Sequence, residues 1–365
     1  MAKEIKKDNR TDLFAATPPL EAKKMLFSLA VTVGVGYQRG DWRKGMKLDF
    51  IDIKRAYFHA AAKRELYIKL PEEDQKEGHC GKLDKSMYGT RDAAQNWEEE
   101  YSNWLIEIGF SRGIASPCVL YHSKKNIRVV IHGDDFTLLG YEESLDWFIE
   151  MIKKKIEYKH RGRLGPEDKD DKAIRILNRV VSWDSEGIKY EPDQRHAEVI
   201  IEQLDVKAKK GFSTPGVKPC DAKDEEGDDE NLEPMEATRY RAAVARGNYL
   251  AQDRSDIKYT VKEVSRHMGT PTVEDARKLT RFVKYLLTRP RQVSRYDYQK
   301  WNGCLNIWAY TDYAGCRETR KSTSGGLITI GDHIIRFWSS TQKVIALSSG
   351  EAEYYGMVRA AAEGI

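Results

Sequence analysis

Cysteine is scarce in this sequence, and its few positions form no pattern. The five residues are Cys80, Cys118, Cys220, Cys304 and Cys316, and no two of them have a Cys-x-x-Cys spacing. An odd number of scattered cysteines argues against a disulfide framework and against a cysteine-based zinc site. We therefore expect a protein of a reducing compartment, cytoplasmic or nuclear, that is not secreted.

Long apolar runs and a strong net charge are also missing. The most apolar stretch, residues 25–35, is too short to span a bilayer, and the charged N-terminus lacks the apolar core of a signal peptide. We expect no membrane partner. The net charge is only +4, with 40% hydrophobic and 32% charged residues. This composition indicates a folded globular protein, and the length allows two or three domains.

Charge is unevenly distributed along the chain. A basic cluster lies within residues 153–163, and residues 221–236 are strongly acidic. The basic cluster can follow a phosphate backbone, although a solvated helix face is the simpler interpretation of such a run. The acidic stretch is interpreted as a linker.

The apolar periodicity predicts helices and strands that alternate irregularly. We expect helices at residues 21–33, 93–108, 144–158, 193–204, 235–252, 255–267 and 273–287, and a final helix from Ser348. We expect strands at residues 47–53, 66–70, 118–122, 127–132, 174–183, 187–190, 304–310, 325–330 and 333–338. This order favours an α+β fold over regular βαβ units.

A Gly-Asp-Asp corner interrupts two β-rich runs at residues 127–140. It predicts a tight hairpin with Asp134 and Asp135 at its tip. Adjacent carboxylates between apolar strands suit a hard cation such as Mg²⁺, which prefers oxygen ligands. The alternative is a type I′ turn in which aspartate is only a turn former.

A second acid, Asp52, favours the metal interpretation. It ends the strand at residues 47–53, and Asp49 on the same strand lies at odd spacing and so on the opposite face. Carboxylates at a strand end and at a hairpin tip can hold two metal ions for an in-line displacement at phosphorus.

These segments resemble the reverse transcriptase of copia-type retrotransposon Pol polyproteins. Residues 50–58 (FIDIKRAYF) are similar to its first catalytic motif, and residues 83–91 (LDKSMYGTR), leading to Trp97, to its template- and primer-positioning motif. Residues 132–135 (HGDD) stand in place of Tyr-Val-Asp-Asp, and residues 13–18 (LFAATP) resemble the entry to the palm.

The resemblance continues downstream with the motifs in order. Tyr240-Arg241, Tyr249-Leu250-Ala251, Asp256-Ile257 and Ser265-Arg266 resemble the connecting region. Residues 309–316 (AYTDYAGC), 320–325 (RKSTSG) and 346–354 (ALSSGEAEY) resemble the start of a ribonuclease H domain.

The resemblance implies a right-hand polymerase palm, a helical and strand connection, and a partial ribonuclease H-like α/β domain. The expected limits are residues 1–161 for an N-terminally truncated fingers and palm region, 162–302 for a thumb and connection region, and 303–365 for the ribonuclease H-like region. The implied partners are an RNA or DNA template with its primer, deoxynucleoside triphosphates and other polyprotein segments. The implied cofactor is Mg²⁺, two ions, with Mn²⁺ as a substitute, and the cytoplasmic location would be a virus-like particle.

Site residues follow from the matched motifs. Asp52 and Asp134 would ligate the metals, with Asp135 beside them. Tyr57 would pack against the sugar and exclude a 2′-hydroxyl, or else be a structural anchor. The substrate-binding set is Tyr57, Gly89 and Arg91, and the first two ribonuclease H acids would be Asp312 and Glu353. Glu351 is the rival to Glu353, but we interpret it as the capping-box partner of Ser348.

Some positions depart from the family pattern. His132-Gly133 replaces Tyr-Val, Ala94 stands where proline is usual, and Asp92 where glutamine or asparagine is common. The fingers segment and the later ribonuclease H acids would lie outside the 365 residues. A second hypothesis is therefore a catalytically silent nucleic-acid-binding remnant. An unrelated phosphotransferase is a weaker third, because no P-loop or kinase signature occurs.

Overall fold

The computed structural model describes residues 4, 13–204, 206, 211–216 and 230–365. The chain forms two compact units, one of Met1–Ile174 with Trp183–Ser185 and one of Arg175–Ser182 with Glu186–Ile365. No helix within the described ranges is both long and apolar enough to cross a membrane. The expected acidic linker lies outside the described residues, apart from 230–236.

The first unit is built on an antiparallel six-stranded sheet in the order β4-β5-β6-β7-β1-β8. Its strands are β1 (Lys47–Ile53), β4 (Ser111–Arg112), β5 (Val119–His122), β6 (Ile127–His132), β7 (Asp135–Gly140) and β8 (Tyr158–Leu164). A short separate pair, β2 (Tyr67–Ile68) and β3 (Gly81–Lys82), and the 3₁₀ turns η1 (Trp42–Lys44), η2 (Ala56–His59) and η3 (Glu72–Asp74) complete it.

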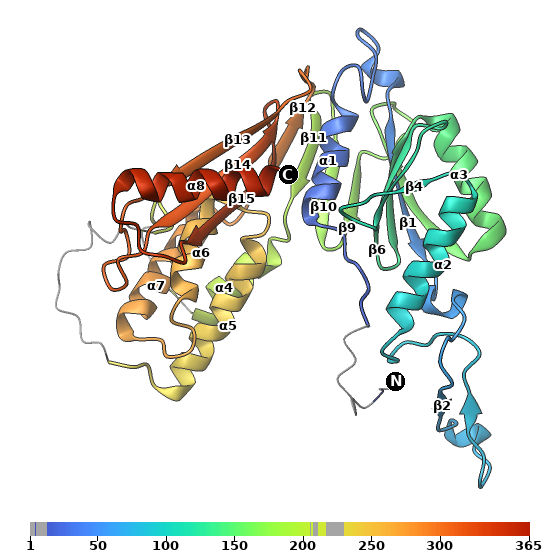
Figure 1. Cartoon of the computed structure of the whole chain (residues 1–365), viewed down its shortest axis with the longest axis horizontal. Helices are drawn as coiled ribbons and strands as arrows, with labels where there is room; N and C mark the ends of the chain where they lie inside the picture. Colours follow the sequence, from blue (N-terminus) through green and yellow to red (C-terminus); the bar gives the residue numbers. More distant parts are fainter. Residues whose placement is uncertain (1–3, 5–12, 205, 207–210, 217–229) are drawn as a thin grey trace. The chain divides into compact units, whose positions relative to one another are not determined.

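Helices cover both faces of this sheet. Figure 1 shows α1 (Leu20–Ala30) on one side of the strands and α2 (Ala93–Glu107) and α3 (Glu142–Lys155) on the other. The apolar stripes of α2 and α3 are buried with the alternate strand residues Ile51, Ile53, Phe136 and Leu138. The opposite alternation of β1 and β7 therefore places Asp52 and Asp135 on the α1 side of the sheet.

A four-stranded sheet, most of whose residues belong to the second unit, is followed by helices. The sheet order is β12-β11-β10-β9, with β9 (Ala173–Ile176), β10 (Arg179–Trp183), β11 (Gly187–Glu191) and β12 (Ser294–Asp297). A shared apolar core joins α4 (Arg195–Leu204), α5 (Pro234–Leu250), η4 (Ser255–Ile257), α6 (Lys258–Ser265) and α7 (Val273–Thr288). The expected N-cap Thr272 forms a capping box with Asp275 at the start of α7.

A three-stranded antiparallel sheet and a helix end the described chain. The strands are β13 (Leu305–Thr311), β14 (Thr323–Ile330) and β15 (His333–Thr341), paired in sequence order, and the helix is α8 (Ser349–Gly364). Ser348 accepts the Glu351 amide as expected for its cap, but the Glu351 carboxylate accepts the Leu347 N–H instead of the Ser348 N–H. The expected capping box is therefore only half formed.

Most expected elements are present, two of them differ from the expectation, and one strand is additional. The strand at residues 66–70 shrinks to Tyr67–Ile68. The expected strand at residues 174–183 is a hairpin, because Leu177 and Asn178 adopt positive φ angles of 43° and 61° and reverse the chain. Strand β8 was not predicted from the sequence.

Candidate active site

Two of the predicted acids face each other across neighbouring strands. Asp52 near the end of β1 is the register partner of Asp135 at the start of β7. Asp134 lies in the turn just before, and its carbonyl accepts the Ile53 N–H at 2.9 Å. Directly paired residues of an antiparallel sheet point to the same face, so the backbone brings Asp52 and Asp135 together as the metal chemistry requires.

The turn that carries Asp134 has a specific geometry. His132 pairs with Asp135, which leaves Gly133 and Asp134 as a two-residue loop. Gly133 has a φ of +65°, whereas Asp134 is not among the described residues of positive φ. One positive φ at the first position fits a type II′ turn rather than the type I′ turn considered from the sequence. The Trp97 indole Nε1–H donates to the Gly133 carbonyl at 2.9 Å and so fixes this turn to α2.

The charges around Asp135 do not cancel. Burial raises the pKa of Asp135, and the negative charges of Asp134 and Asp52 raise it further, whereas Lys23 and Arg161 act in the opposite direction. Lys23 is a buried residue of α1. Asp135 is thus a desolvated carboxylate beside two other acids, and a nearby cation favours its ionised form.

The donor chemistry fits a hard divalent ion. Asp52, Asp134 and Asp135 offer only carboxylate oxygens, which are the preferred ligands of Mg²⁺. Nevertheless, among the residues that the structure describes, no group of three His, Cys, Asp or Glu side chains is arranged to hold a metal ion. The Asp52 carboxylate is instead bonded to the Arg161 guanidinium from β8.

Asp49 has a different role from Asp52. On the opposite face of β1 its two oxygens accept from Arg163 Nε and Nη2 at 2.7 and 2.8 Å, and His160 Nε2 lies 3.5 Å away. Burial opposes ionisation of Asp49, yet the Arg163 and His160 contacts hold its pKa below the usual value. Asp49 is therefore a buried structural acid, as its strand position predicts.

Of the predicted substrate-binding residues, Tyr57 belongs to an aromatic pair, and Gly89 and Arg91 have backbone bonds to Glu4. Tyr57 in η2 is half-buried against the core, and its ring centroid lies 4.4 Å from that of Tyr88. Gly89 has a φ of +100°, and its carbonyl accepts the Glu4 N–H. The Arg91 backbone N–H donates to the Glu4 carboxylate. Packing of Tyr57 is compatible with both of the roles considered for it.

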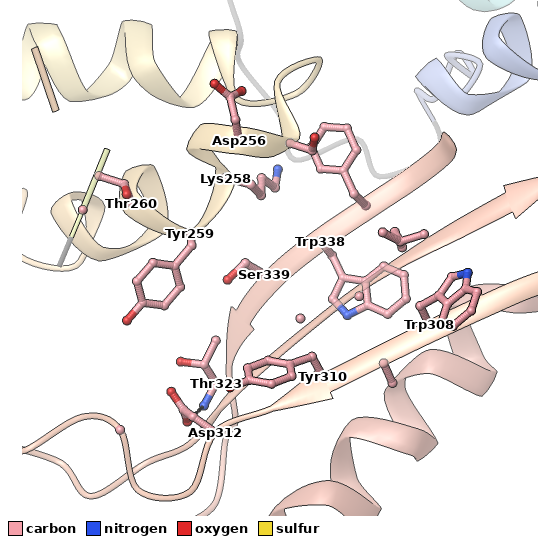
Figure 2. Close-up of a pocket in the computed structure, with 18 of the residues that line it drawn as sticks. Asp256, Lys258, Tyr259, Thr260, Trp308, Tyr310, Asp312, Thr323, Trp338 and Ser339 are labelled. Carbon is pink, nitrogen blue, oxygen red and sulfur yellow. Dashed lines mark hydrogen bonds between the residues drawn. The ribbon is translucent and has the colours of Figure 1, made fainter. Parts of the chain in front are cut away.

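Asp312 lies in the wall of a cavity of about 870 Å³ in the second unit. Figure 2 shows Asp312 beside Tyr310 and Thr323, and its Oδ1 accepts the Thr323 N–H at 2.6 Å. The cavity is bordered by residues of η4 and α6 and by β13, β14 and β15. Asp312 therefore already has a structural hydrogen bond to the neighbouring strand.

Glu353 is exposed on α8, whereas Glu351 is engaged. Glu351 Oε1 accepts the Tyr355 hydroxyl, and Oε2 accepts the Leu347 N–H at 2.7 Å. This geometry favours Glu353 over Glu351 as an acid with oxygens available to a ligand.

The sequence analysis missed three residues beside the acids. The positive charges of Lys23 and Arg161 act to lower the pKa of Asp135. Burial and the negative charge of Asp134 raise the pKa of Tyr88. Tyr88 lies within the predicted template- and primer-positioning motif, and Arg161 lies within the basic cluster. Neither residue was predicted to lie beside the acids. Lys23 lies on the apolar face of its helix and is buried there. A lysine on an apolar helix face is a signal that the sequence contains.

The chain is similar in sequence to a known family and to retrotransposon polyproteins. Residues 26–167 match the family described as "Reverse transcriptase (RNA-dependent DNA polymerase)". The Retrovirus-related Pol polyprotein from transposon RE1 of Arabidopsis thaliana is 25% identical over 346 residues, which cover 92% of this chain and 22% of that protein. The polyprotein from transposon TNT 1-94 of Nicotiana tabacum is 26% identical over 327 residues, covering 85% of this chain and 23% of that protein.

This chain spans less than a quarter of the length of these relatives. Among solved structures, the prototype foamy virus protease–reverse transcriptase is similar with a TM-score of 0.27 and 12% identity, covering 96% of this chain and 38% of that chain. The sequence matches confirm the resemblance, and the chain is a relative of the copia-type retrotransposon reverse transcriptases.

Proposed function

We propose that this chain is an RNA-directed DNA polymerase that extends a primer on an RNA or DNA template with deoxynucleoside triphosphates. The observation that carries the proposal is the register pairing of Asp52 with Asp135, with Asp134 in the adjoining turn. These acids lie within the residues that match the reverse transcriptase family. Oxygen ligands on adjacent strands are what nucleotidyl transfer needs at its reacting centre.

Asp52 and Asp134 would hold two Mg²⁺ ions, with Asp135 contributing negative charge beside them. Bound there, the ions would supply activation of the primer 3′-hydroxyl and stabilisation of the leaving pyrophosphate. The protein positions these acids through the β1–β7 ladder and through the Trp97 hydrogen bond to Gly133. The Tyr57 ring, held against Tyr88, would exclude a 2′-hydroxyl and so favour deoxynucleotides.

For residues 303–365 we propose a ribonuclease H-like region in which Asp312 and Glu353 are the first two acids. The succession of three antiparallel strands and a helix, together with the motifs that they carry, supports this assignment. We also propose that the protein acts in the cytoplasm, in a virus-like particle, or in the nucleus, together with other polyprotein segments.

A silent nucleic-acid-binding remnant is the second candidate function. The bond between Arg161 and Asp52 favours it, because a cation fixed on a catalytic carboxylate opposes metal binding. The same holds for the finding that no three-ligand group exists within the described residues.

Primer extension on an RNA template in Mg²⁺ or Mn²⁺ distinguishes the two functions. The proposal predicts extension that is abolished by Asp52→Asn or Asp134→Asn. Asp168→Asn is the matched control, because Asp168 is an exposed acid of the same unit outside the site and its loss should leave extension unchanged. Template binding without extension by the unaltered chain, in either metal, would support the remnant and contradict the polymerase.

A further inference from the structure

The basic segment after α3 divides between the two faces of the six-stranded sheet. Strand β8 pairs with β1, and the register shifts by one residue between Phe50 and Ile51. Phe50 is opposite Gly162 and Ile51 opposite His160, so Arg161 is the extra residue of a β-bulge. A bulge re-aims a side chain and is frequent beside active sites.

The bulge determines which aspartate each basic residue of β8 contacts. His160 and Arg163 both reach Asp49 on one face, whereas the Arg161 guanidinium reaches Asp52 on the other. Without the extra residue, positions 160 and 163 would point to opposite faces of the strand. Gly162 allows the bulge with a φ of +149°, and a Cβ there would lie 2.3 Å from Asp171 Oδ2.

Arg161 therefore contacts a carboxylate that is also a proposed metal ligand. Its Nη2 donates to Asp52 Oδ2, and the two side chains are 46% and 23% exposed. A guanidinium and a divalent ion at the same carboxylate repel each other, so the two cations compete for Asp52.

We propose that Arg161 is an internal counter-ion that a divalent cation must displace from Asp52 before the site can work. This inference rests on the proposed function, because it takes Asp52 as a metal ligand. Since the two cations compete for one carboxylate, removal of Arg161 should strengthen cation binding. Arg161 is thus a positioning residue, which sets the cation concentration at which Asp52 becomes available.

Mn²⁺ binding to the full chain, followed by the electron paramagnetic resonance of free Mn²⁺ in the absence of nucleotide and nucleic acid, tests this directly. Arg161→Gln should lower the Mn²⁺ dissociation constant by about two- to fivefold, the range expected for loss of a solvent-exposed ion pair. Arg161→Lys should fall between Arg161→Gln and the unaltered chain, because it keeps the charge but loses the planar guanidinium.

Lys159→Gln is the matched control. Lys159 is exposed, lies two residues away on β8 and is the register partner of Asp52, so its loss removes the same unit of charge. Its effect on the Mn²⁺ dissociation constant should be clearly smaller. An equal effect of Lys159→Gln would overturn the proposal, because a neighbouring positive charge would then act as strongly as the Arg161 guanidinium that is bonded to Asp52.

Asp52→Asn separates failure of this inference from failure of the proposed function. In the chain with Arg161 it should weaken Mn²⁺ binding, and in that background Arg161→Gln should give no comparable gain. If Asp52→Asn weakens binding but Arg161→Gln changes nothing, the counter-ion inference alone is wrong. If Asp52→Asn leaves binding unchanged, the metal site of the proposed function is wrong as well. Circular dichroism of each variant confirms that the fold is kept.

Discussion

Trp97 shows how one polar atom on a buried ring can serve the site. The ring is only 1% exposed and packs in the core as the helical periodicity of α2 predicts, but its Nε1–H also holds the Gly133 carbonyl. The sequence indicates the core position of Trp97 but not this bond, because the partner is a backbone atom 36 residues away.

Trp97→Phe keeps an aromatic ring in the core but removes the Nε1–H donor together with the pyrrole part of the indole, so we expect a turn that is less well fixed. Loss of one such hydrogen bond costs about 1 kcal/mol, and if that loss is felt at the acids, primer extension should fall by about fivefold. Single-turnover extension measures it. A variant as active as the unaltered chain would show that the bond does not position Asp134.

Asp49→Asn should destabilise the first unit strongly. Asp49 is 1% exposed and Arg163 15%, so the variant leaves a buried guanidinium without its main partner. Removal of one member of a buried pair costs about 3–5 kcal/mol, measured by urea denaturation with tryptophan fluorescence. Asp146→Asn is the control, since Asp146 bonds the same Arg163 but is 63% exposed and should cost about 1 kcal/mol or less.

The pH dependence of this pair has a defined sign. Because the folded pKa of Asp49 is lowered, its contribution to stability is present above the unfolded value of about 3.9 and is lost as the pH falls through the lower folded value. The stability difference between the unaltered chain and Asp49→Asn should therefore shrink below about pH 4. A difference that stays constant from pH 7 to pH 3 would contradict this account of Asp49.

At the scale of elements, the sequence predicts the buried apolar strand β1 but not the charged strand β8. The apolar strand β1 has the expected limits, whereas β8, with the sequence Tyr-Lys-His-Arg-Gly-Arg-Leu, was not predicted. Strand β8 is the edge of the sheet, and edge strands carry charge that prevents pairing with other chains. Its charges therefore hide the alternation by which a strand is recognised, and with it the placement of Arg161.

Apart from the acidic site, the C-terminal end of α3 is the clearest candidate for contact with a primer–template duplex. Lys153, Lys154 and Lys155 are exposed in its last turn, and only Lys155 has a described ion pair, with Glu100 at 3.1 Å. Neutralising all three with glutamine should reduce the slope of log affinity against log salt for a primer–template duplex, because each phosphate contact releases counterions. Fluorescence anisotropy at several salt concentrations measures the slope. An unchanged slope would make this cluster a solvated helix face.

At the scale of the whole molecule, the sequence predicted an α+β chain with its acids in separated segments. It also predicted a reverse transcriptase relationship, which the comparisons confirm. The side-chain contacts of Asp52 could not be predicted from the sequence. Whether Asp52 contacts a metal ion or an arginine depends on the register of β8 and on its bulge. No local pattern of residues encodes either.

We expect no cleavage of the RNA strand in RNA–DNA hybrids by this 365-residue chain. Ribonuclease H chemistry also uses two metal ions, and the chain offers Asp312, which bonds Thr323, and Glu353 as its matching acids. Two carboxylates compensate only half of the charge of two divalent ions. A hybrid with a labelled RNA strand measures cleavage, and cleavage that is lost in Asp312→Asn would contradict this expectation.

The location of bound Mn²⁺ tests the central claim most directly. Crystals of the chain with a primer–template, a deoxynucleoside triphosphate and Mn²⁺ should show two anomalous peaks, about 3.5–4 Å apart, between the carboxylates of Asp52 and Asp134. Arg161 should then have left Asp52. The account would be contradicted by a bound primer–template with no Mn²⁺ at these acids and the Arg161 guanidinium still bonded to Asp52.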